Sequence, residues 1–266
     1  MSRIETTFTT LQLESRKALI PFFVAGDPSI EATLPVMHAA VRAGANLIEL
    51  GFPFSDPFAD GPVIQRSSER ALQRGVNLNF VFKVVAEFRK ENTKTPIILM
   101  GYLNPIEMMG MNKFATTAAA AGVDGVILVD MPVEELDILH AAFNPVGLCC
   151  IQFISPTTPP ERAERLLRQA QGFIYFVTIA GVTGGNLDVA SVEARLKALH
   201  TKSSIPIVAG FGVKDGQSAC HLAANSSGVV IGSGLVNAIS SATTPQQASE
   251  ATFTFLHAIR SALDMR

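Results

Sequence analysis

The chain has 266 residues, of which 48% are hydrophobic and 17% are charged, and its formal net charge is −2. This length allows two small domains or one large α/β barrel, and the hydrophobic content suffices for a large core. The near-zero charge gives no indication of a nucleic-acid or anionic-membrane partner. No apolar stretch approaches the roughly 18–20 residues of a membrane span. Residues 1–12 are polar and lack the apolar segment of a signal peptide.

Three cysteines, Cys149, Cys150 and Cys220, make an odd number for a disulfide framework, and two of them are adjacent in an apolar run. Packed, reduced thiols of this kind are typical of a protein from a reducing compartment. We therefore expect a cytoplasmic protein.

Eight short apolar runs alternate with helical segments along the chain. The expected strands are residues 18–24, 47–50, 96–102, 124–129, 146–154, 173–178, 205–209 and 228–231. The expected helices are residues 30–42 with Ser29 as N-cap, 63–73, 79–90, 112–121, 133–143, 159–170, 189–200, 215–224, 235–239 and 245–263. Residues 1–12 are assigned no element.

Strands that are apolar along their whole length are typical of a parallel sheet buried on both faces. Eight of them, with no linker between, predict one α/β domain over residues 1–266, a (β/α)8 TIM barrel with extra helices. The alternative is an open doubly wound sheet. That fold needs no eighth strand and usually carries G-x-G-x-x-G after the first strand, and neither condition is met. In a barrel, the loops after the strands form one rim, where the active site is expected.

A carboxylate pair is the first feature of that rim. Glu49 lies inside an apolar run, where a carboxylate is costly to bury, and Asp60 follows in a loop stiffened by prolines. Two carboxyl groups in different environments suit general acid and base catalysis. The alternatives are a structural carboxylate at Glu49 and an ordinary Asp-Gly turn at Asp60.

Glycine-rich turns after the last three strands are the second feature. They are Thr183-Gly184-Gly185, Gly210-Phe211-Gly212 and Gly232-Ser233-Gly234. One such turn shows only that the backbone needs glycine, but three on one side of a barrel predict a cradle of N–H groups for a phosphate.

Four aromatic residues at strand ends, Phe22, Tyr102, Tyr175 and Phe211, are the third feature. Each alone is more often a core residue, but together they favour a flat, apolar ligand group. All five histidines fall in expected helices and no lysine ends a strand, which argues against a histidine-bound metal and a Schiff base. Carboxylate catalysis on a phosphorylated substrate with an apolar part remains.

These residues resemble one known family over nearly the whole chain, the tryptophan synthase α subunits. Residues 49–65, E-L-G-F-P-F-S-D-P-F-A-D-G-P-V-I-Q, are similar to its most distinctive signature. Other matching motifs occur in the family's order: L-I-P-F-F-V-A-G-D-P at 19–28, Y-x-N-P at 102–105, G-V-D-G at 122–125, D-M-P-V-E-E at 130–135, P-T-T-P at 156–159, G-V-T-G at 181–184 and G-F-G at 210–212.

The resemblance implies a lyase that cleaves indole-3-glycerol phosphate to indole and glyceraldehyde 3-phosphate. It implies that Glu49 is the general acid and base, protonating indole C3 and taking the hydroxyl proton of the side chain. Asp60 would bind the indole N–H and stabilise the charged ring. Phe22 and Tyr102 match ring-pocket positions, Tyr175 lies in the matching sixth strand near Glu49, and Gly184, Gly212, Gly232 and Ser233 match the phosphate cradle. Thr183 and Phe211, from the glycine-rich turns and the aromatic set above, complete the expected substrate-binding residues.

The resemblance also implies a partner, the β subunit of tryptophan synthase, in an α2β2 tetramer. The α chain itself has no cofactor or metal, and pyridoxal phosphate belongs to the β subunit, which joins indole to serine. The matching docking residues are Pro53, Asp56, Pro57, Asn104 and Pro105. Residues 180–187 match a mobile lid over the phosphate.

One position departs from the family pattern. Ile179 stands where the family usually has arginine, just before A-G-V-T-G, so closure of the lid or its coupling to the β subunit is expected to be weaker. Arginine at this position should then raise β-stimulated turnover. Two alternatives remain open: a barrel that only binds a partner, disfavoured by retention of Glu49 and Asp60, and another phosphate-binding barrel enzyme of tryptophan biosynthesis. The latter would need lysine or cysteine at strand ends.

Overall fold

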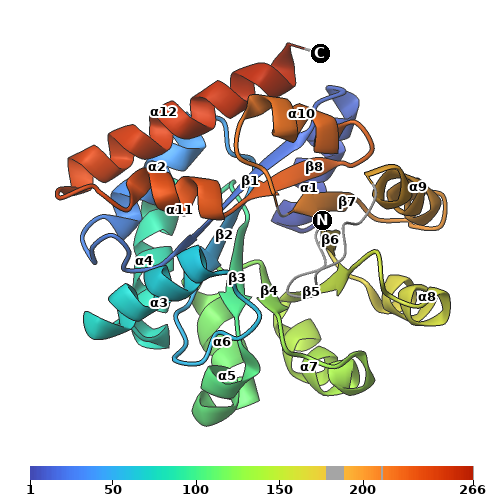
Figure 1. The fold of residues 1–266 in the computed structure, drawn as a ribbon. Coiled ribbons are helices and arrows are strands. Elements are labelled where there is room, and N and C mark those ends of the chain that lie inside the picture. The colour runs from blue at the N-terminus through green and yellow to red at the C-terminus, as the bar shows by residue number, and fades with distance from the viewer. Residues whose placement is uncertain (178–188, 211, 266) are drawn as a thin grey trace.

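Eight parallel strands close into a barrel in the order β1-β2-β3-β4-β5-β6-β7-β8, with β8 pairing back onto β1 (Figure 1). The computed structural model describes residues 1–177, 189–210 and 212–265. The strands are β1 (Ala18–Val24), β2 (Ile48–Gly51), β3 (Ile97–Gly101), β4 (Gly125–Leu128), β5 (Cys149–Ile154), β6 (Ile174–Val177), β7 (Ile207–Gly210) and β8 (Gly228–Ile231). The predicted TIM barrel is confirmed.

Helices surround the barrel on its outside (Figure 1). They are α1 (Arg3–Leu13), α2 (Thr33–Arg42), α3 (Pro62–Gln73), α4 (Leu78–Glu91), α5 (Leu103–Met109), α6 (Met111–Ala121), α7 (Leu136–Phe143), α8 (Pro160–Gln169), α9 (Val189–His200), α10 (Gly216–Ala223), α11 (Ser233–Ile239) and α12 (Pro245–Asp264), with short 3-10 turns at Val133–Glu135 and Asn144–Val146. This covering explains the strand composition, since every residue of β1, β2, β3, β4, β7 and β8 is buried.

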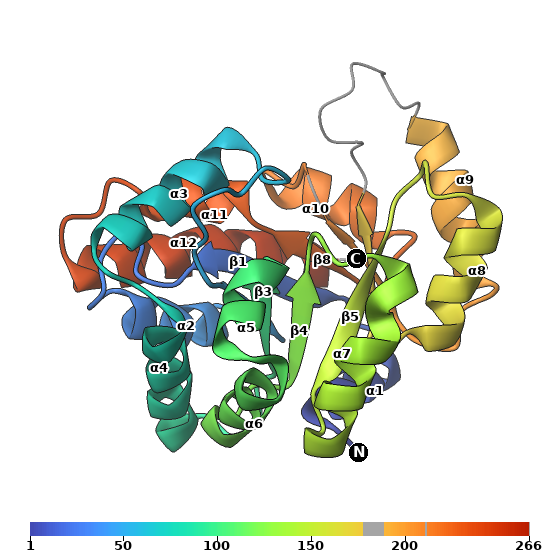
Figure 2. The same ribbon diagram turned by 90° about the horizontal axis from the view of Figure 1, so that it is seen from below.

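Helix α1 is an element that the sequence reading missed. It begins with a capping box between Ser2 and Glu5, and it buries Ile4, Phe8 and Leu11 along one face. The Phe8 ring lies 5.7 Å from that of Phe173, just before β6. The helix therefore covers the amino end of the barrel, opposite the strand ends where the site lies (Figure 2).

Helix α5 was also missed, and it contains Asn104 and Pro105, two of the expected docking residues. Both residues lie in its first turn, where proline is tolerated because the N–H it lacks would have no helical partner. Asp130, which follows β4, accepts a hydrogen bond from the backbone N–H of Leu103 at 2.9 Å. The start of α5 is thereby fixed to the neighbouring strand end.

Helix α2 begins at Thr33 rather than directly after Ser29. The Ser29 hydroxyl accepts a hydrogen bond from the N–H of Ala32 in a separate turn, which follows the cis Asp27-Pro28 bond. Helix α11 begins at Ser233, two residues earlier than expected. Ser233 is therefore placed in the first turn of a helix beside the end of β8.

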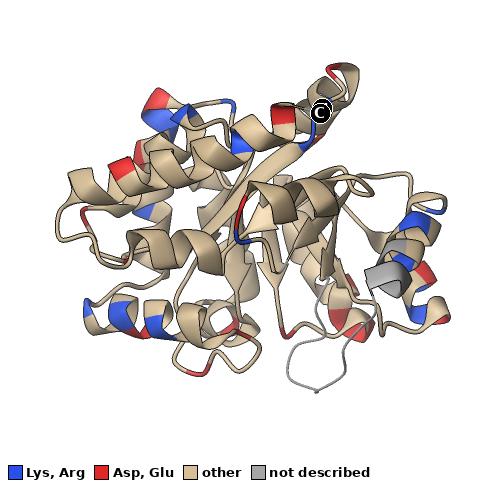
Figure 3. Ribbon diagram, turned by 45° about the horizontal axis from the view of Figure 1, so that its top comes forward, with Lys and Arg blue, Asp and Glu red and all other residues tan. Residues whose placement is uncertain are grey.

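Charged residues are interspersed over the outer helices and loops (Figure 3). The three cysteines carry free thiols, as expected. Within the described part of the chain, no helix combines the length and apolar character that crossing a membrane requires.

Candidate active site

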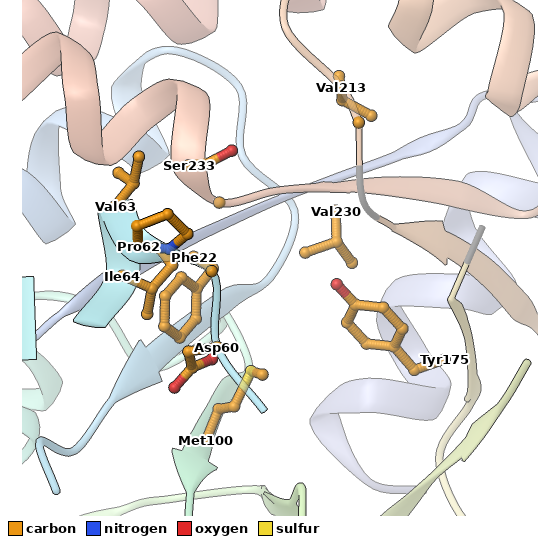
Figure 4. A pocket seen from close by; sticks show the side chains of 13 residues that line it. Phe22, Asp60, Pro62, Val63, Ile64, Met100, Tyr175, Val213, Val230 and Ser233 are labelled. Atoms are coloured by element: carbon orange, nitrogen blue, oxygen red, sulfur yellow. The ribbon is translucent and has the colours of Figure 1, made fainter. Parts of the chain in front are cut away.

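A cavity of about 260 Å³ opens at the carboxyl end of the barrel (Figure 4). Phe22, Asp60 and Met100 lie on one side of it and Tyr175 on another. The lining residues are Phe22, Asp60, Gly61, Pro62, Val63, Ile64, Met100, Tyr175, Gly212, Val213, Val230, Gly232 and Ser233. Of the expected site residues, the cavity therefore brings together Phe22, Asp60, Tyr175, Gly212, Gly232 and Ser233, whereas Glu49 and Tyr102 do not line it.

Glycines at the strand ends make room for the aromatic side chains of the cavity. A Cβ added at Gly51 would lie 3.0 Å from the Phe22 ring, and one added at Gly210 would lie 2.2 Å from the hydroxyl oxygen of Tyr175. Phe22 is therefore held over the end of β2, and Tyr175 over the end of β7. The Tyr175 ring also contacts Phe153 of β5, with centroids 4.9 Å apart.

Glu49 lies on β2 directly beside Phe22, its register partner on β1. Because Gly51, two residues further along the strand, faces the Phe22 ring, Glu49 also points into the barrel. It is completely buried, and neither carboxyl oxygen has a hydrogen-bond partner among the described residues. This burial raises the pKa of Glu49 well above its ordinary value. This environment favours the protonated form of the acid.

Asp60 lies at the edge of the cavity, in the loop between β2 and α3. Its carboxylate accepts a hydrogen bond from the Tyr102 hydroxyl at 3.1 Å, and Gln65 of α3 donates to its backbone carbonyl at 2.9 Å. Burial raises the pKa of Asp60 to about 6, and the Tyr102 hydrogen bond opposes that rise. Asp60 is thus mostly ionised above pH 6. The burial of Glu49, by contrast, disfavours its ionised form.

Tyr175 lies close enough to Glu49 and Asp60 that ionisation of either carboxyl group acts on its hydroxyl. Complete burial, then Glu49, then Asp60 raise the pKa of the Tyr175 hydroxyl well above its ordinary value. Tyr175 therefore stays neutral and lies within electrostatic reach of both carboxyl groups. The acid pair and the aromatic residue form one site.

Tyr102 does not line the main cavity. It lies behind Asp60, in an adjoining narrow space of about 10 Å³ that it shares with Phe22, Phe54 and Asp60. Its expected contact with the ring of the ligand therefore stays a prediction, while its contact with Asp60 is direct.

The expected phosphate end of the cavity is formed by Gly212, Gly232 and Ser233. Gly212 has φ of +84°, which requires glycine, and Ser233 begins α11. Thr183, Gly184, Phe211, Ile179 and the lid at 180–187 lie outside the described residues.

Several apolar lining residues were not predicted, among them Ile64, Met100, Val213 and Val230. In sequence they are indistinguishable from core residues. Met100 and Val230 had only a positional signal, since each lies two residues before an expected site residue, Tyr102 or Gly232, near the carboxyl end of a strand.

The expected docking residues differ in their exposure to solvent. Asp56 and Asn104 are exposed, Pro57 and Pro105 are partly buried, and Pro53 is buried beneath its loop. Two large apolar side chains near them, Phe58 and Met108, are 70% and 80% exposed.

All five histidines lie in helices, as expected. Among the described residues, no three or more His, Cys, Asp or Glu side chains group closely enough to hold a metal ion.

The model of the family "Tryptophan synthase alpha chain" matches residues 8–263. The chain belongs to this family. The tryptophan synthase alpha chain of Xanthomonas campestris pv. campestris (strain B100) is 54% identical over 264 residues, covering 98% of this chain and 97% of the relative. That of Xanthomonas euvesicatoria pv. vesicatoria (strain 85-10) is 54% identical over the full length of both chains.

Solved structures of tryptophan synthase agree with this membership. The alpha subunit from Legionella pneumophila str. Paris superposes with a TM-score of 0.93 at 40% identity, covering all of both chains. A chain of tryptophan synthase from M. tuberculosis in its aminoacrylate-bound form superposes with a TM-score of 0.88 at 28% identity, covering 99% and 100%. The tryptophan synthase alpha chain is a lyase that cleaves indole-3-glycerol phosphate, so the predicted family and enzyme class are confirmed.

Proposed function

We propose that this cavity binds indole-3-glycerol phosphate and that Glu49 and Asp60 divide the chemistry of its cleavage. The observation that carries the proposal is the contrast between two acids: Asp60 lines the cavity, and Glu49 lies on β2 beside Phe22, which also lines it. Glu49 is fully buried without a hydrogen-bond partner among the described residues, and Asp60 is hydrogen-bonded at the cavity edge. Such contrasting environments separate an acid from a carboxylate at neutral pH.

The reaction follows from these protonation states. Protonated Glu49 gives its proton to C3 of the indole ring, and ionised Asp60 stabilises the positive charge that develops on the ring nitrogen. Glu49, now ionised, takes the proton of the side-chain hydroxyl next to C3. The bond between C3 and that carbon breaks, its electron pair returns to the ring, and an aldehyde forms. Indole and D-glyceraldehyde 3-phosphate are released, and Glu49 is protonated again.

Substrate binding is assigned by the shape of the cavity. Phe22 and Tyr175 offer apolar surface to the indole ring, and backbone N–H groups at Gly212, Gly232 and Ser233 suit the phosphate. Thr183, Gly184 and Phe211 complete the proposal from the sequence motifs alone. No cofactor is needed for this proton transfer within the chain.

The test is indole release from indole-3-glycerol phosphate. We expect Glu49→Gln and Asp60→Asn each to lose at least about a hundredfold in kcat, because general acid–base catalysis contributes roughly 10²–10⁴-fold. Glu69→Gln is the matched control, since it makes the same chemical change at an exposed residue of α3. Full activity of Glu49→Gln would overturn the mechanism.

We further propose that the chain docks on a β subunit in an α2β2 tetramer, through Pro53, Asp56, Pro57, Asn104 and Pro105. Pyridoxal phosphate would be bound by that partner, which uses the indole to make L-tryptophan from L-serine. The exposed Phe58 and Met108 support an interface here, as does the Pyrococcus furiosus neighbour, described as a tryptophan synthase complex. Co-purification with the β subunit, compared between wild type and Asp56→Lys, tests the docking face.

Two broader expectations belong to the same proposal. Closure of the sheet by pairing of β1 with β8 supports a single domain over residues 1–266. The three free thiols support a cytoplasmic location.

A further inference from the structure

Tyr102 makes two hydrogen bonds with the loop that carries Asp60. Its hydroxyl oxygen accepts a hydrogen bond from the backbone N–H of Ala59 at 3.0 Å, and it donates to the Asp60 carboxylate at 3.1 Å. One hydroxyl therefore fixes both the backbone and the side chain at the catalytic end of the loop. Among the described residues, Tyr102 supplies the side-chain hydrogen bond to this carboxylate.

The ring of Tyr102 is held between two aromatic residues of the same loop. Phe54 stacks on it with centroids 5.1 Å apart and planes at 30°, and Phe58 packs at 5.5 Å and 59°. Tyr102 itself is only 2% exposed, although Phe58 is 70% exposed. The loop thus wraps around the tyrosine rather than lying freely over the barrel.

The base of Tyr102 is equally well fixed. The residue follows β3 and is the N-cap of α5, whose first N–H, that of Leu103, is bound by Asp130. A rigid strand end and helix start therefore determine where the hydroxyl lies. This is the arrangement expected of a side chain that supports a catalytic group rather than the substrate.

We propose that Tyr102 is the positioning residue for Asp60, and that Phe54 and Phe58 hold it in place for this task. The inference rests on the proposed function, because it concerns the carboxylate that stabilises the charged ring. It also gives Tyr102 a different task from the ring contact implied by the family motif.

The Tyr102 hydroxyl also has an electrostatic effect on the Asp60 carboxyl group. A hydrogen bond donated to the ionised form lowers the pKa of Asp60 and so opposes the effect of burial, which brings it to about 6. Other titratable groups near this pair are Glu49 on β2, Tyr175 on β6 and Asp130 after β4. A substitution at Tyr102 leaves all three of these side chains in place.

The test compares wild type with Tyr102→Phe, which keeps the ring and removes the hydroxyl. Indole release is measured as kcat/KM between pH 5 and 9. Loss of a hydrogen bond to the charged carboxylate should move the acidic limb from about pH 6 upward by about one to two units. This corresponds to a loss of about fivefold to fiftyfold at pH 6 and recovery to within about threefold of wild type at pH 8.5. An unchanged limb overturns the inference.

A second readout does not depend on activity. The Asp60 carboxyl is titrated by carbon NMR in the full chain, with Asp60→Asn identifying its signal, and its midpoint should rise in Tyr102→Phe. If wild type releases no indole, the proposed function fails, whereas an equal midpoint in both proteins refutes the positioning role alone.

If circular dichroism shows that Tyr102→Phe is unfolded, Phe58→Leu carries the test. Loosening the ring contact should raise the Asp60 midpoint by a smaller amount, whereas Phe253→Leu on α12, 37% exposed, should leave it unchanged. No movement in Phe58→Leu refutes the role of the aromatic contact.

Discussion

Replacement of Glu49 by glutamine should stabilise the protein, and the gain should depend on pH. Burial raises the pKa of Glu49 in the folded state, so the folded protein keeps its proton at pH values where the unfolded chain loses it. Ionisation of the unfolded chain therefore lowers the free energy of unfolding as pH rises above the ordinary value of 4.5. Glutamine has nearly the same shape and cannot ionise.

The size of the effect follows from the linkage of proton binding and folding. While folded Glu49 stays protonated, each pH unit above 4.5 should widen the difference between the variant and wild type by about 1.4 kcal/mol. Between pH 4.5 and pH 6.5, the gain is therefore at most about 3 kcal/mol. Below pH 4.5 the two proteins should differ little, because both carry a neutral, buried side chain.

Urea unfolding followed by circular dichroism at several pH values measures this difference. Ile48→Val is the matched control, since it removes one methyl group from the neighbouring, fully buried position of β2. It should cost about 1 kcal/mol at every pH. A Glu49→Gln difference that is the same at pH 5 and pH 7 would show that Glu49 is ionised in the folded protein, and the proposed acid would have to be another group.

Two further predictions concern the opposite ends of the barrel. Gly210→Ala places a Cβ 2.2 Å from the Tyr175 hydroxyl oxygen, so the tyrosine ring must move. KM for the substrate should rise about tenfold, which corresponds to a typical overpacking cost of about 1.4 kcal/mol. An unchanged KM would contradict the close contact. Asp124→Asn removes the buried partner of Arg3 and Arg89 at the amino end, both at 2.8 Å or less. Urea unfolding should show a loss of about 3 kcal/mol, with kcat within about twofold of wild type, and a large loss of kcat would refute the separation of stability from the site.

The barrel was predictable because its signal is repeated. Each strand is almost entirely apolar, and such strands are typical of a parallel sheet that is buried on both faces. Helix α1 gave a weaker signal, since three buried residues, Ile4, Phe8 and Leu11, are spread among polar ones. Its spacing and its capping box were nevertheless present in the sequence. Helix α5 was missed because Pro105 reads as a breaker unless the start of the helix is known.

The two acidic residues of the site were predictable from the sequence, whereas the side-chain contacts around them were not. Glu49 is conspicuous as a carboxylate in an apolar strand, and its complete burial agrees with that reading. The bond from Tyr102 to Asp60 joins residues 42 positions apart through side-chain geometry, which no local pattern encodes. Apolar lining residues such as Met100 and Val230 have no chemical mark that separates them from the core.

The glycines at the strand ends have a consequence for how this pocket can evolve. A methyl group added at Gly101 would overlap Phe52 and one added at Gly210 would overlap Tyr175, whereas one added at Gly51 would make a tight contact with Phe22. A larger residue at Gly101 or Gly210 therefore requires that its aromatic neighbour move or become smaller. A new substrate preference would have to arise through paired substitutions across adjacent strands, and single-site libraries would miss it.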